Sequence, residues 1–338
     1  MAILVTGGAG FIGSHTTVEL ITRGYEVIIV DNLINSKVSA LDRIEQITGV
    51  RPKFYELDLV DFDSVTQIFM ENKIDAVIHF AGLKAVGESV SMPLMYYQNN
   101  LISTLNLLNR MLAFKVDHLV FSSSATVYGM PKTVPIKEDF PLSATNPYGQ
   151  TKLMIETMLK DMAKAFPSLS ISILRYFNPI GAHESGLIGE DPRGIPNNLV
   201  PYVARVAEGQ LECVHVFGND YPTPDGTGVR DYIHVVDLAR AHIAALNRAR
   251  QVKGVECFNI GTGNGYSVLE VIRAYEQASG KKIPYQIDPR RPGDIAVCYA
   301  DPTKATEVLG WTAEFDLARM CKDTHRWQSM NPKGLPYN

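Results

Sequence analysis

Short apolar runs alternate with longer stretches of helical spacing along the first half of the chain. The runs lie at residues 3–5, 27–30, 76–78 and 119–121. Apolar side chains at successive positions are typical of strands that are buried on both faces, as in a parallel sheet covered by helices. The stretches between them are long enough for crossover helices. The pattern therefore predicts an α/β fold with a doubly wound parallel sheet.

The spacing of glycine and proline changes after residue 175. Both residues cluster between positions 179 and 228, which is typical of a loop-rich unit. Loops over the carboxyl ends of a parallel sheet often carry specificity. We therefore expect a cofactor-binding domain over residues 1–175 and a smaller, mixed α/β substrate domain over residues 176–338. A strand near 256–260 could return to the first sheet, in which case the domains are not contiguous in sequence.

The composition excludes several classes of protein. Of 338 residues, 46% are hydrophobic and 20% charged, and 32 basic against 36 acidic residues leave a net charge of −4. This balance argues against a disordered chain and against a nucleic-acid binder. No targeting pattern or membrane-spanning apolar run is present, so no membrane partner is expected. The four cysteines and eight histidines show no spacing typical of disulfide frameworks or metal ligands. We expect a cytoplasmic protein without a metal cofactor.

A glycine-rich turn follows the first predicted strand and opens the first predicted helix. In it, Gly7 permits a tight turn, Gly10 lets backbone N–H groups approach a pyrophosphate, and Gly13 allows close helix packing. A plain tight turn also uses glycine, but the position between strand and helix favours a Rossmann-like dinucleotide site. Asp31 ends the second strand, where a carboxylate can accept ribose hydroxyls and would repel a 2′-phosphate. The sequence therefore predicts NAD rather than NADP.

A second group of residues suggests proton transfer. Tyr148 and Lys152 lie one turn apart in a helix predicted to begin after the loop that ends at Pro147. An ammonium on the same face can lower the pKa of a phenol from about 10 and make it a usable base. Ser124, just past the strand predicted at residues 119–121, can bind a substrate hydroxyl and pass its proton toward Tyr148. Each feature alone is more often structural, but together with the nucleotide-binding turn they favour catalysis.

Three motifs resemble those of the extended short-chain dehydrogenase/reductase family. They are TGGAGFIG at residues 6–13, SSSATVYG at 122–129 and YGQTK at 148–152. Four further segments narrow the resemblance to the UDP-glucose 4-epimerases within that family, and the match covers nearly the whole chain. These segments lie at residues 31–33, 79–89, 175–179 and 231–235.

The resemblance implies an isomerase that interconverts UDP-glucose and UDP-galactose through a 4-keto intermediate with bound NAD. It implies that the first domain binds NAD and the second binds the UDP-sugar. It also implies a homodimer packed through the helices near residues 95–112 and after residue 148. Galactose breakdown and the supply of polysaccharide precursors need the same reaction, so both remain open as pathways.

Site residues are also implied by the resemblance. Tyr148 would be the acid/base, Lys152 its electrostatic partner and a ligand of the nicotinamide ribose, and Ser124 the residue that binds the sugar hydroxyl. The residues implied to contact NAD are Gly7, Gly10, Phe11, Ile12, Gly13, Asp31, Asn32, Asn35, Ser36, Asp58, Leu59, Phe80, Ala81, Gly82, Lys84, Asn99, Ser122, Tyr148, Lys152 and Tyr176. Those implied to contact the UDP-sugar are Lys84, Ser124, Tyr148, Phe177, Asn178, Asn198, Leu199, Phe217, Arg230, Tyr232, Arg291, Asp294 and Cys298.

Some of these residues have simpler interpretations. Cationic side chains such as Arg230 and Arg291 suit a diphosphate, but each alone could be a solvated surface arginine. Asp58 could accept from an adenine amine or could only cap a helix.

Two other functions are possible on the same fold. Related sugar-nucleotide 4,6-dehydratases carry an Asp-Glu pair just before the Val-Tyr-Gly, whereas this chain has Ala125 and Thr126, which cannot serve as carboxylic acid and base. A scaffold that binds NAD without catalysis would have no use for Ser124, Tyr148 and Lys152. The sequence therefore favours epimerisation over both alternatives.

Cys298 bears on the substrate range. The resemblance places it where hexose-restricted bacterial members carry a tyrosine beside the sugar 2-substituent. A thiol leaves more space than a phenol, so we expect UDP-N-acetylglucosamine and UDP-N-acetylgalactosamine to be accepted as well. The alternative is a small cysteine that only packs the core.

Overall fold

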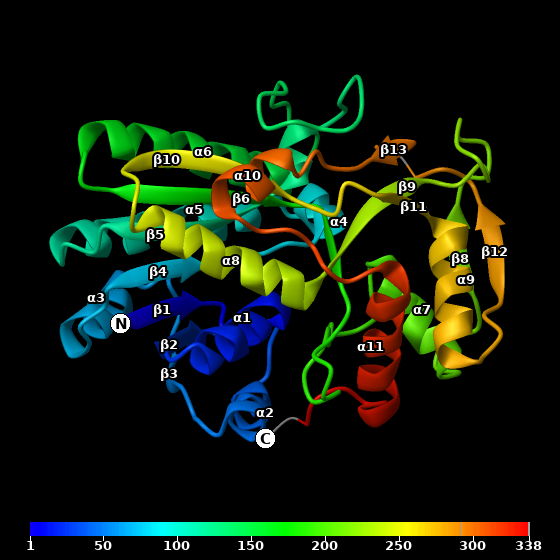
Figure 1. Ribbon diagram of the computed structural model, residues 1–338, viewed down its shortest axis with the longest axis horizontal. Coiled ribbons are helices and arrows are strands. Elements are labelled where there is room, and N and C mark those ends of the chain that lie inside the picture. The colour runs from blue at the N-terminus through cyan, green and yellow to red at the C-terminus, as the bar shows by residue number, and fades with distance from the viewer. Residues whose placement is uncertain (292, 337–338) are drawn as a thin grey trace.

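The computed structural model describes residues 1–291 and 293–336, and its larger part is built on a seven-stranded parallel sheet (Figure 1). The strand order is β10-β6-β5-β4-β1-β2-β3. From β1 the chain adds strands first on one side and then on the other, as in a doubly wound fold. This confirms the predicted Rossmann-like α/β class. The strands are β1 (Ala2–Thr6), β2 (Glu26–Asp31), β3 (Lys53–Glu56), β4 (Ala76–His79), β5 (His118–Ser124), β6 (Ser170–Tyr176) and β10 (Gly254–Ile260).

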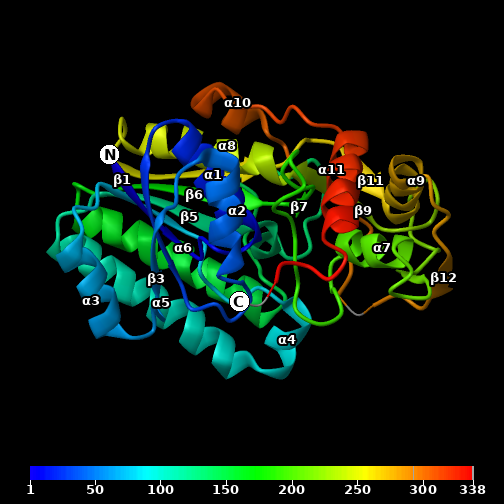
Figure 2. The same cartoon turned by 90° about the horizontal axis from the view of Figure 1, so that it is seen from below.

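Helices cover both faces of this sheet because alternate strand residues point to opposite sides. Ile3 and Val5 of β1 belong to one buried cluster, and Ala2 and Leu4 belong to the other. Figure 2 shows the two helix layers on either side of the sheet. The first layer contains α1 (Phe11–Thr22), α2 (Ser39–Thr48), α8 (Val235–Ala249) and α10 (Thr303–Leu309). The second contains α3 (Phe62–Glu71), α5 (Pro93–Ala113) and α6 (Pro147–Ala165), with α4 (Val86–Ser91) packed against α5 and α6.

A smaller part built on short strands lies beside the carboxyl end of the large sheet (Figure 1). Strand β9 pairs with β7, β11 and β13, and β8 pairs with β12. A separate buried cluster joins these strands to three helices. The elements are β7 (Asn178–Ile180), α7 (Leu199–Ala207), β8 (Val214–Phe217), β9 (Val229–His234), β11 (Gly265–Ser267), α9 (Val268–Ser279), β12 (Tyr285–Asp288), β13 (Val297–Cys298) and α11 (Leu317–Met330).

Helix α8 and strand β10 come late in the sequence but pack with the large sheet. Strand β10 pairs in parallel with β6 along its whole length. The residues that build the large sheet are therefore not contiguous, while the boundary near residue 175 stays a prediction.

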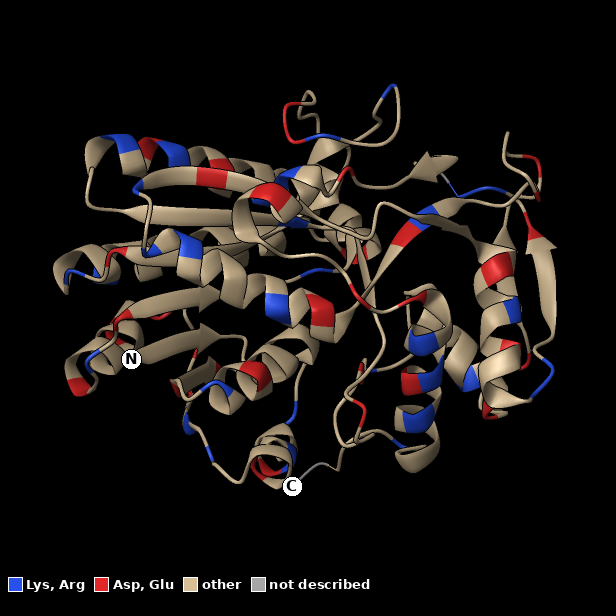
Figure 3. Cartoon of the chain, in the orientation of Figure 1, with Lys and Arg blue, Asp and Glu red and all other residues tan. Residues whose placement is uncertain are grey.

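Charged side chains are spread over the outer surface. Figure 3 shows basic and acidic residues interspersed along α6, α9 and α11. Within the part of the chain that the structure describes, no helix is long and apolar enough to cross a membrane.

Candidate active site

The glycine-rich turn between β1 and α1 has the geometry of a phosphate cradle. Gly7 has φ +68°, and a Cβ there would lie 2.9 Å from the backbone nitrogen of Ala81. A Cβ on Gly13 would lie 2.2 Å from the Gly7 carbonyl oxygen, so only glycine lets the helix pack this closely. Gly10 caps α1 without a side-chain hydrogen bond, and the first turn holds no acidic residue. The positive end of the helix, at Phe11 and Ile12, therefore suits a pyrophosphate.

Asp31 occupies the end of β2, beside this turn. Its carboxylate accepts hydrogen bonds from the backbone nitrogens of Ala9 (3.1 Å) and Leu33 (2.9 Å) and from Ser36 Oγ (2.8 Å). Burial raises the pKa of Asp31, and these three hydrogen bonds act in the opposite direction. A carboxylate has about four lone-pair positions, so this anchored group can still accept from a ribose. The turn and Asp31 together fit the phosphates and adenosine ribose of NAD.

Other residues predicted to bind the cofactor also follow the strands of the sheet. Asn32 donates from Nδ2 to Oδ2 of Asp58 at 3.0 Å, which joins the ends of β2 and β3. The Leu59 side chain is buried in the core, and the Tyr176 hydroxyl forms a buried hydrogen bond with His242. The side chains of Leu59 and Tyr176 therefore pack inside the protein. The remaining members of the set lie at exposed or partly buried positions: Asn35, Phe80, Ala81, Gly82, Lys84 and Asn99.

The proposed proton-transfer residues meet at the carboxyl end of β5. Helix α6 begins at Pro147, and the Asn146 side chain caps it by accepting from the Gly149 backbone nitrogen at 2.8 Å. Lys152 Nζ donates to the Ser122 carbonyl oxygen at 2.8 Å and lies 6.0 Å from the centre of the Tyr148 ring.

Ser124 ends β5 next to this pair. Its Oγ accepts hydrogen bonds from the backbone nitrogen (3.2 Å) and from Oγ1 (3.0 Å) of Thr126. Thr126 is the second residue of the 3₁₀ turn η1 (Ala125–Tyr128). The structure thus brings together the three residues that the sequence singled out for proton transfer.

The pKa values of Tyr148 and Lys152 reflect mainly burial, so the electrostatic role expected for Lys152 stays a prediction. Burial raises the pKa of Tyr148, and only a hydrogen bond with Ser124 lowers it. Burial also lowers the pKa of Lys152 to about 8, while the Glu156 charge acts in the opposite direction. The physical reason is that the phenol and the ammonium are both desolvated, and that Nζ donates to the Ser122 carbonyl rather than to the phenol.

A buried ion pair between Glu156 of α6 and Arg175 of β6, which the sequence analysis missed, holds α6 against the sheet. Arg175 donates from Nη2 (2.6 Å) and Nε (3.0 Å) to the two carboxylate oxygens of Glu156, and from Nη1 to the Tyr128 hydroxyl at 2.8 Å. Glu156 also accepts from Ser123 Oγ at 2.6 Å. This network joins α6 to β5, β6 and η1, so it fixes Tyr148 relative to the serines. The signal in the sequence was an arginine inside the otherwise uncharged run of β6.

Several residues predicted for the UDP-sugar gather beside β9. The Arg291 guanidinium lies 4.8 Å from the centre of the Phe217 ring, and its Nε lies 2.9 Å from Asp294 Oδ2. Arg230 Nη2 lies 3.9 Å from Asp294 Oδ1, and Cys298 pairs in register with Arg230 across β13 and β9. The structure therefore forms one group of five predicted residues, with an aromatic face and two cations.

A second group from the substrate set lies around Glu190, which the sequence analysis did not single out. Glu190 Oε1 accepts from Asn198 Nδ2 at 3.0 Å and lies 3.5 Å from Lys84 Nζ. Asn198 precedes Leu199, the first residue of α7. Glu190 thus connects Lys84, which follows β4 of the large sheet, with Asn198, which precedes α7 in the smaller part.

The rest of the substrate set lies along β7 and β9. Asn178 is exposed and pairs in register with Tyr232, which is buried. Burial raises the pKa of Tyr232 to about 12. Phe177 is buried in a cluster that Cys298 also contacts.

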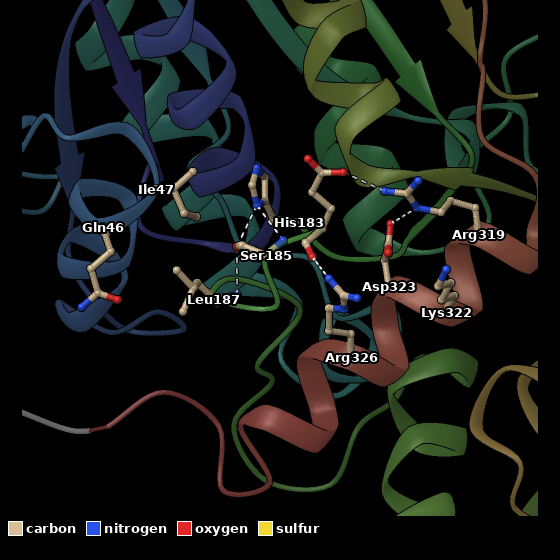
Figure 4. Close-up of a pocket in the computed structure, with 10 residues that line it drawn as sticks. Gln46, Ile47, His183, Ser185, Leu187, Arg319, Lys322, Asp323 and Arg326 are labelled. Carbon is tan, nitrogen blue, oxygen red and sulfur yellow. Dashed lines mark hydrogen bonds and ion pairs between the residues drawn. The ribbon is translucent and has the colours of Figure 1, made fainter.

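A cleft of about 610 Å³ between α2 and α11 contains none of the predicted residues (Figure 4). Two of its arginines are engaged by Glu184: Arg319 lies 3.1 Å from the Glu184 carboxylate, and Arg326 donates to the Glu184 backbone carbonyl oxygen at 2.7 Å. Across the described ranges, no group of three His, Cys, Asp or Glu side chains is placed to hold a metal ion.

Comparison with known proteins identifies the family. A family model described as GDP-mannose 4,6 dehydratase matches residues 4–324. The UDP-glucose 4-epimerase of Bacillus subtilis is 62% identical over 334 residues, which cover 99% of this chain and 98% of that protein. A crystal structure of UDP-glucose 4-epimerase from Bifidobacterium longum in complex with NAD+ and UDP matches with 58% identity and a TM-score of 0.95, covering 99% of this chain and 100% of that one.

A more distant solved structure concerns the substrate range. The UDP-Glc/GlcNAc 4-epimerase of Campylobacter jejuni matches with 38% identity and a TM-score of 0.85, covering 97% of this chain and 99% of that one. The full-length matches confirm the resemblance that the motifs indicated. The chain belongs to the extended short-chain dehydrogenase/reductase family and, within it, to the UDP-glucose 4-epimerases.

Proposed function

We propose that this chain is an NAD-dependent isomerase that interconverts UDP-glucose and UDP-galactose through a 4-keto intermediate. The observation that carries the proposal is the meeting of Tyr148, Lys152 and Ser124 at the end of β5, in the same sheet as the phosphate cradle. A relative that is 62% identical over nearly its whole length bears the name of this activity. NAD fits the uncapped beginning of α1 and the anchored carboxylate of Asp31.

In the proposed mechanism the protein residues handle the proton of the sugar 4-hydroxyl. Ser124 holds that hydroxyl, and Tyr148 accepts its proton as the 4-keto sugar forms and returns it afterwards. Lys152 uses one N–H on the Ser122 carbonyl, which leaves two for a ribose and the phenol. NAD supplies the acceptor, and then the donor, of the C4 hydride. Since the hydride returns to the other face of the same carbon, the reaction needs no external oxidant.

A 4,6-dehydratase is the main alternative, because the matching family model carries that description. Elimination needs a carboxylic acid and a carboxylate beside the sugar. At the two positions concerned stand Ala125, which packs against a hydrophobic cluster, and Thr126, whose Oγ1 donates to Ser124 Oγ. The site therefore supports hydride transfer and its reversal, and lacks the pair for the elimination step.

A non-catalytic scaffold is the second alternative. Burying a lysine ammonium beside a partly buried tyrosine costs free energy and brings no benefit to a scaffold. The buried Lys152 beside the partly buried Tyr148 therefore favours an enzyme.

We also propose that UDP-N-acetylhexoses are accepted. Cys298 is partly buried and contacts the cluster that contains Phe177, Val127 and Tyr128, so it lies close to the turn after Ser124. Burial raises the pKa of the Cys298 thiol to about 11, which keeps it neutral and unreactive. A neutral thiol is smaller than a phenol and leaves room for an acetamido group. The similarity to the UDP-Glc/GlcNAc 4-epimerase of Campylobacter jejuni supports this range.

The proposed oligomer is a homodimer formed through α5 and α6, which pack against each other. Both helices present apolar side chains to solvent: Leu94 is 74% exposed, Leu105 45%, Ile102 38% and Met154 37%. We infer that these four residues belong to that interface, because exposed apolar side chains on neighbouring helices often mark an interaction surface. We place the enzyme in the cytoplasm, and the four free cysteines, at positions 213, 257, 298 and 321, suit a reducing compartment.

Incubation of the purified protein with UDP-galactose, without added NAD, tests the function. The proposal predicts an equilibrium mixture with UDP-glucose, because the cofactor is regenerated within each cycle. A 4-keto-6-deoxy product would establish the dehydratase instead, and unchanged UDP-galactose with NAD bound would establish a scaffold.

A further inference from the structure

A segment of the smaller part of the chain reaches across to the loop that follows β2. We call residues 190–194 the bridge segment and residues 32–37 the adenosine loop, because the latter follows Asp31 and contains three of the residues implied to contact NAD. No motif pointed to the bridge segment, and it holds none of the predicted site residues. Its contacts connect the smaller part of the chain directly to the adenosine loop.

A buried ion pair makes the first contact between them. Lys37 Nζ lies 2.9 Å from Asp191 Oδ2, and the two side chains are 7% and 16% exposed. The same ammonium donates to the Leu335 carbonyl oxygen at 2.7 Å, while the Leu335 backbone nitrogen donates to Asp191 Oδ2 at 2.8 Å. Lys37, Asp191 and Leu335 therefore form a closed ring of three interactions. An ammonium this deeply buried is stable only while its partners stay in place.

Arg193 makes the second contact. Its Nη2 donates to the carbonyl oxygens of Leu33 (2.7 Å) and Ser36 (3.3 Å). Leu33 has φ +57°, a backbone conformation that a leucine adopts only when its surroundings hold it there. One exposed guanidinium thus fixes two peptide groups of the adenosine loop, including that of Ser36, whose Oγ donates to Asp31.

The C-terminal residues hold the bridge segment from its other side. A Cβ on Gly334 would lie 2.1 Å from Asp191 Oδ1, so the chain runs directly against the aspartate. Ser39 Oγ, at the beginning of α2, donates to the Pro336 carbonyl oxygen at 2.7 Å. Figure 2 shows the segment that follows α11 running toward α2. The adenosine loop is therefore held by two segments that lie far from it in the sequence.

A cleft of about 430 Å³, lined in part by Glu190, Asp191 and Pro192, adjoins the bridge segment. On that side Arg205 donates to the carbonyl oxygens of Pro192 (3.0 Å) and Gly194 (2.6 Å), which ties the segment to α7. The polar contacts to Lys37, Leu33 and Ser36 tie it to the adenosine loop.

We propose that the bridge segment retains the dinucleotide by keeping the adenosine loop closed, with Arg193 and the Lys37–Asp191 pair as positioning residues. The inference rests on the proposed function, since it takes the bound group to be NAD. A ligand that is held under a loop leaves only when the loop opens, so contacts made only in the closed state slow its release. Retention matters for this reaction because the reduced cofactor must stay until the hydride returns.

The test uses the NAD-loaded protein and measures exchange of bound NAD against radiolabelled NAD+ in solution. Arg193→Ala removes the two hydrogen bonds to the adenosine loop from an exposed position, so the variant should fold. Loss of these bonds should speed exchange about tenfold. Arg193→Lys should recover part of the retention, because an ammonium can reach one of the two carbonyls.

Arg326→Ala is the matched control. Arg326, labelled in Figure 4, is also an exposed arginine that donates to a backbone carbonyl, that of Glu184, which lies outside the adenosine loop. Its exchange rate should equal that of the parent. All three variants should match the parent in turnover at saturating NAD and in thermal midpoint after removal of NAD, since Arg193 acts on NAD retention alone.

The outcomes separate this inference from the proposed function. If Arg193→Ala exchanges NAD at the parent rate, or if Arg326→Ala exchanges it equally fast, retention by the bridge segment is refuted while the epimerase proposal stands. If the parent binds no NAD at all, both fail together.

Discussion

The buried pair of Glu156 and Arg175 offers a stringent test of how the catalytic helix is held. The two side chains are 0% and 2% exposed, and each makes a further buried hydrogen bond, to Ser123 and Tyr128 respectively. Glu156→Leu removes one charge and leaves the guanidinium without its counter-ion. The variant should therefore lose far more stability than removal of a surface charge would cost.

The magnitude follows from the burial of both partners. Breaking a buried ion pair from one side costs about 3–5 kcal/mol, because the remaining charge is uncompensated. Replacing both residues, as Glu156→Leu with Arg175→Met, removes that charge. What remains is mainly the loss of three hydrogen bonds, to Ser123, Tyr128 and the Glu138 carbonyl oxygen, at about 1 kcal/mol each. The double variant should thus be more stable than Glu156→Leu alone. The matched control is the surface pair of Arg248 and Glu256, with side chains 28% and 26% exposed, where a single substitution should cost about 1 kcal/mol or less.

Equilibrium unfolding in urea, with every protein at the same NAD loading, gives the required free energies. The reasoning is refuted if Glu156→Leu costs less than about 1 kcal/mol, or if the double variant is less stable than Glu156→Leu alone.

Three further predictions concern pH, substrate range and assembly. The pKa of the buried His15, His79 and His242 is lowered to about 3, mainly by burial, so as pH falls the unfolded chain takes up protons first. The free energy of unfolding should fall below pH ~6.5 by up to about 1.4 kcal/mol per pH unit for each histidine, and equal urea midpoints at pH 7 and pH 5 would contradict this. Cys298→Tyr should lower turnover of UDP-N-acetylgalactosamine about tenfold or more relative to UDP-galactose, and an equal effect on both sugars would remove the gating role. Leu105→Glu should convert the dimer to a monomer in sedimentation equilibrium, and an unchanged dimer mass would place the interface elsewhere.

The central strands of the large sheet could be predicted from sequence because they are buried on both faces. The runs at 3–5 and 119–121 therefore consist of consecutive apolar residues, and the pattern is local. The small sheets could not be predicted in the same way. Strand β13 has two residues and β11 has three, and both owe their existence to pairing with β9 from distant parts of the chain.

The same distinction applies to the site. Tyr148 and Lys152 lie within one turn of a helix, so their proximity follows from spacing alone. The contacts of Lys37 with Asp191 and of Arg193 with the adenosine loop join residues far apart in sequence, and each looks like an ordinary surface charge until the chain is folded. The raised pKa of Tyr148 was missed for a related reason, since burial depends on the packing around the helix.

The role of Tyr148 is the central claim, and the initial rate of UDP-galactose conversion by NAD-loaded Tyr148→Phe tests it most directly. The control is Tyr25→Phe, which removes a phenol hydroxyl whose partner is Asn247, outside the predicted site. If Tyr148 carries the proton, its variant should lose about 100-fold or more in rate while NAD stays bound, and the control should match the parent. A Tyr148→Phe protein that converts UDP-galactose as fast as the parent would contradict the account.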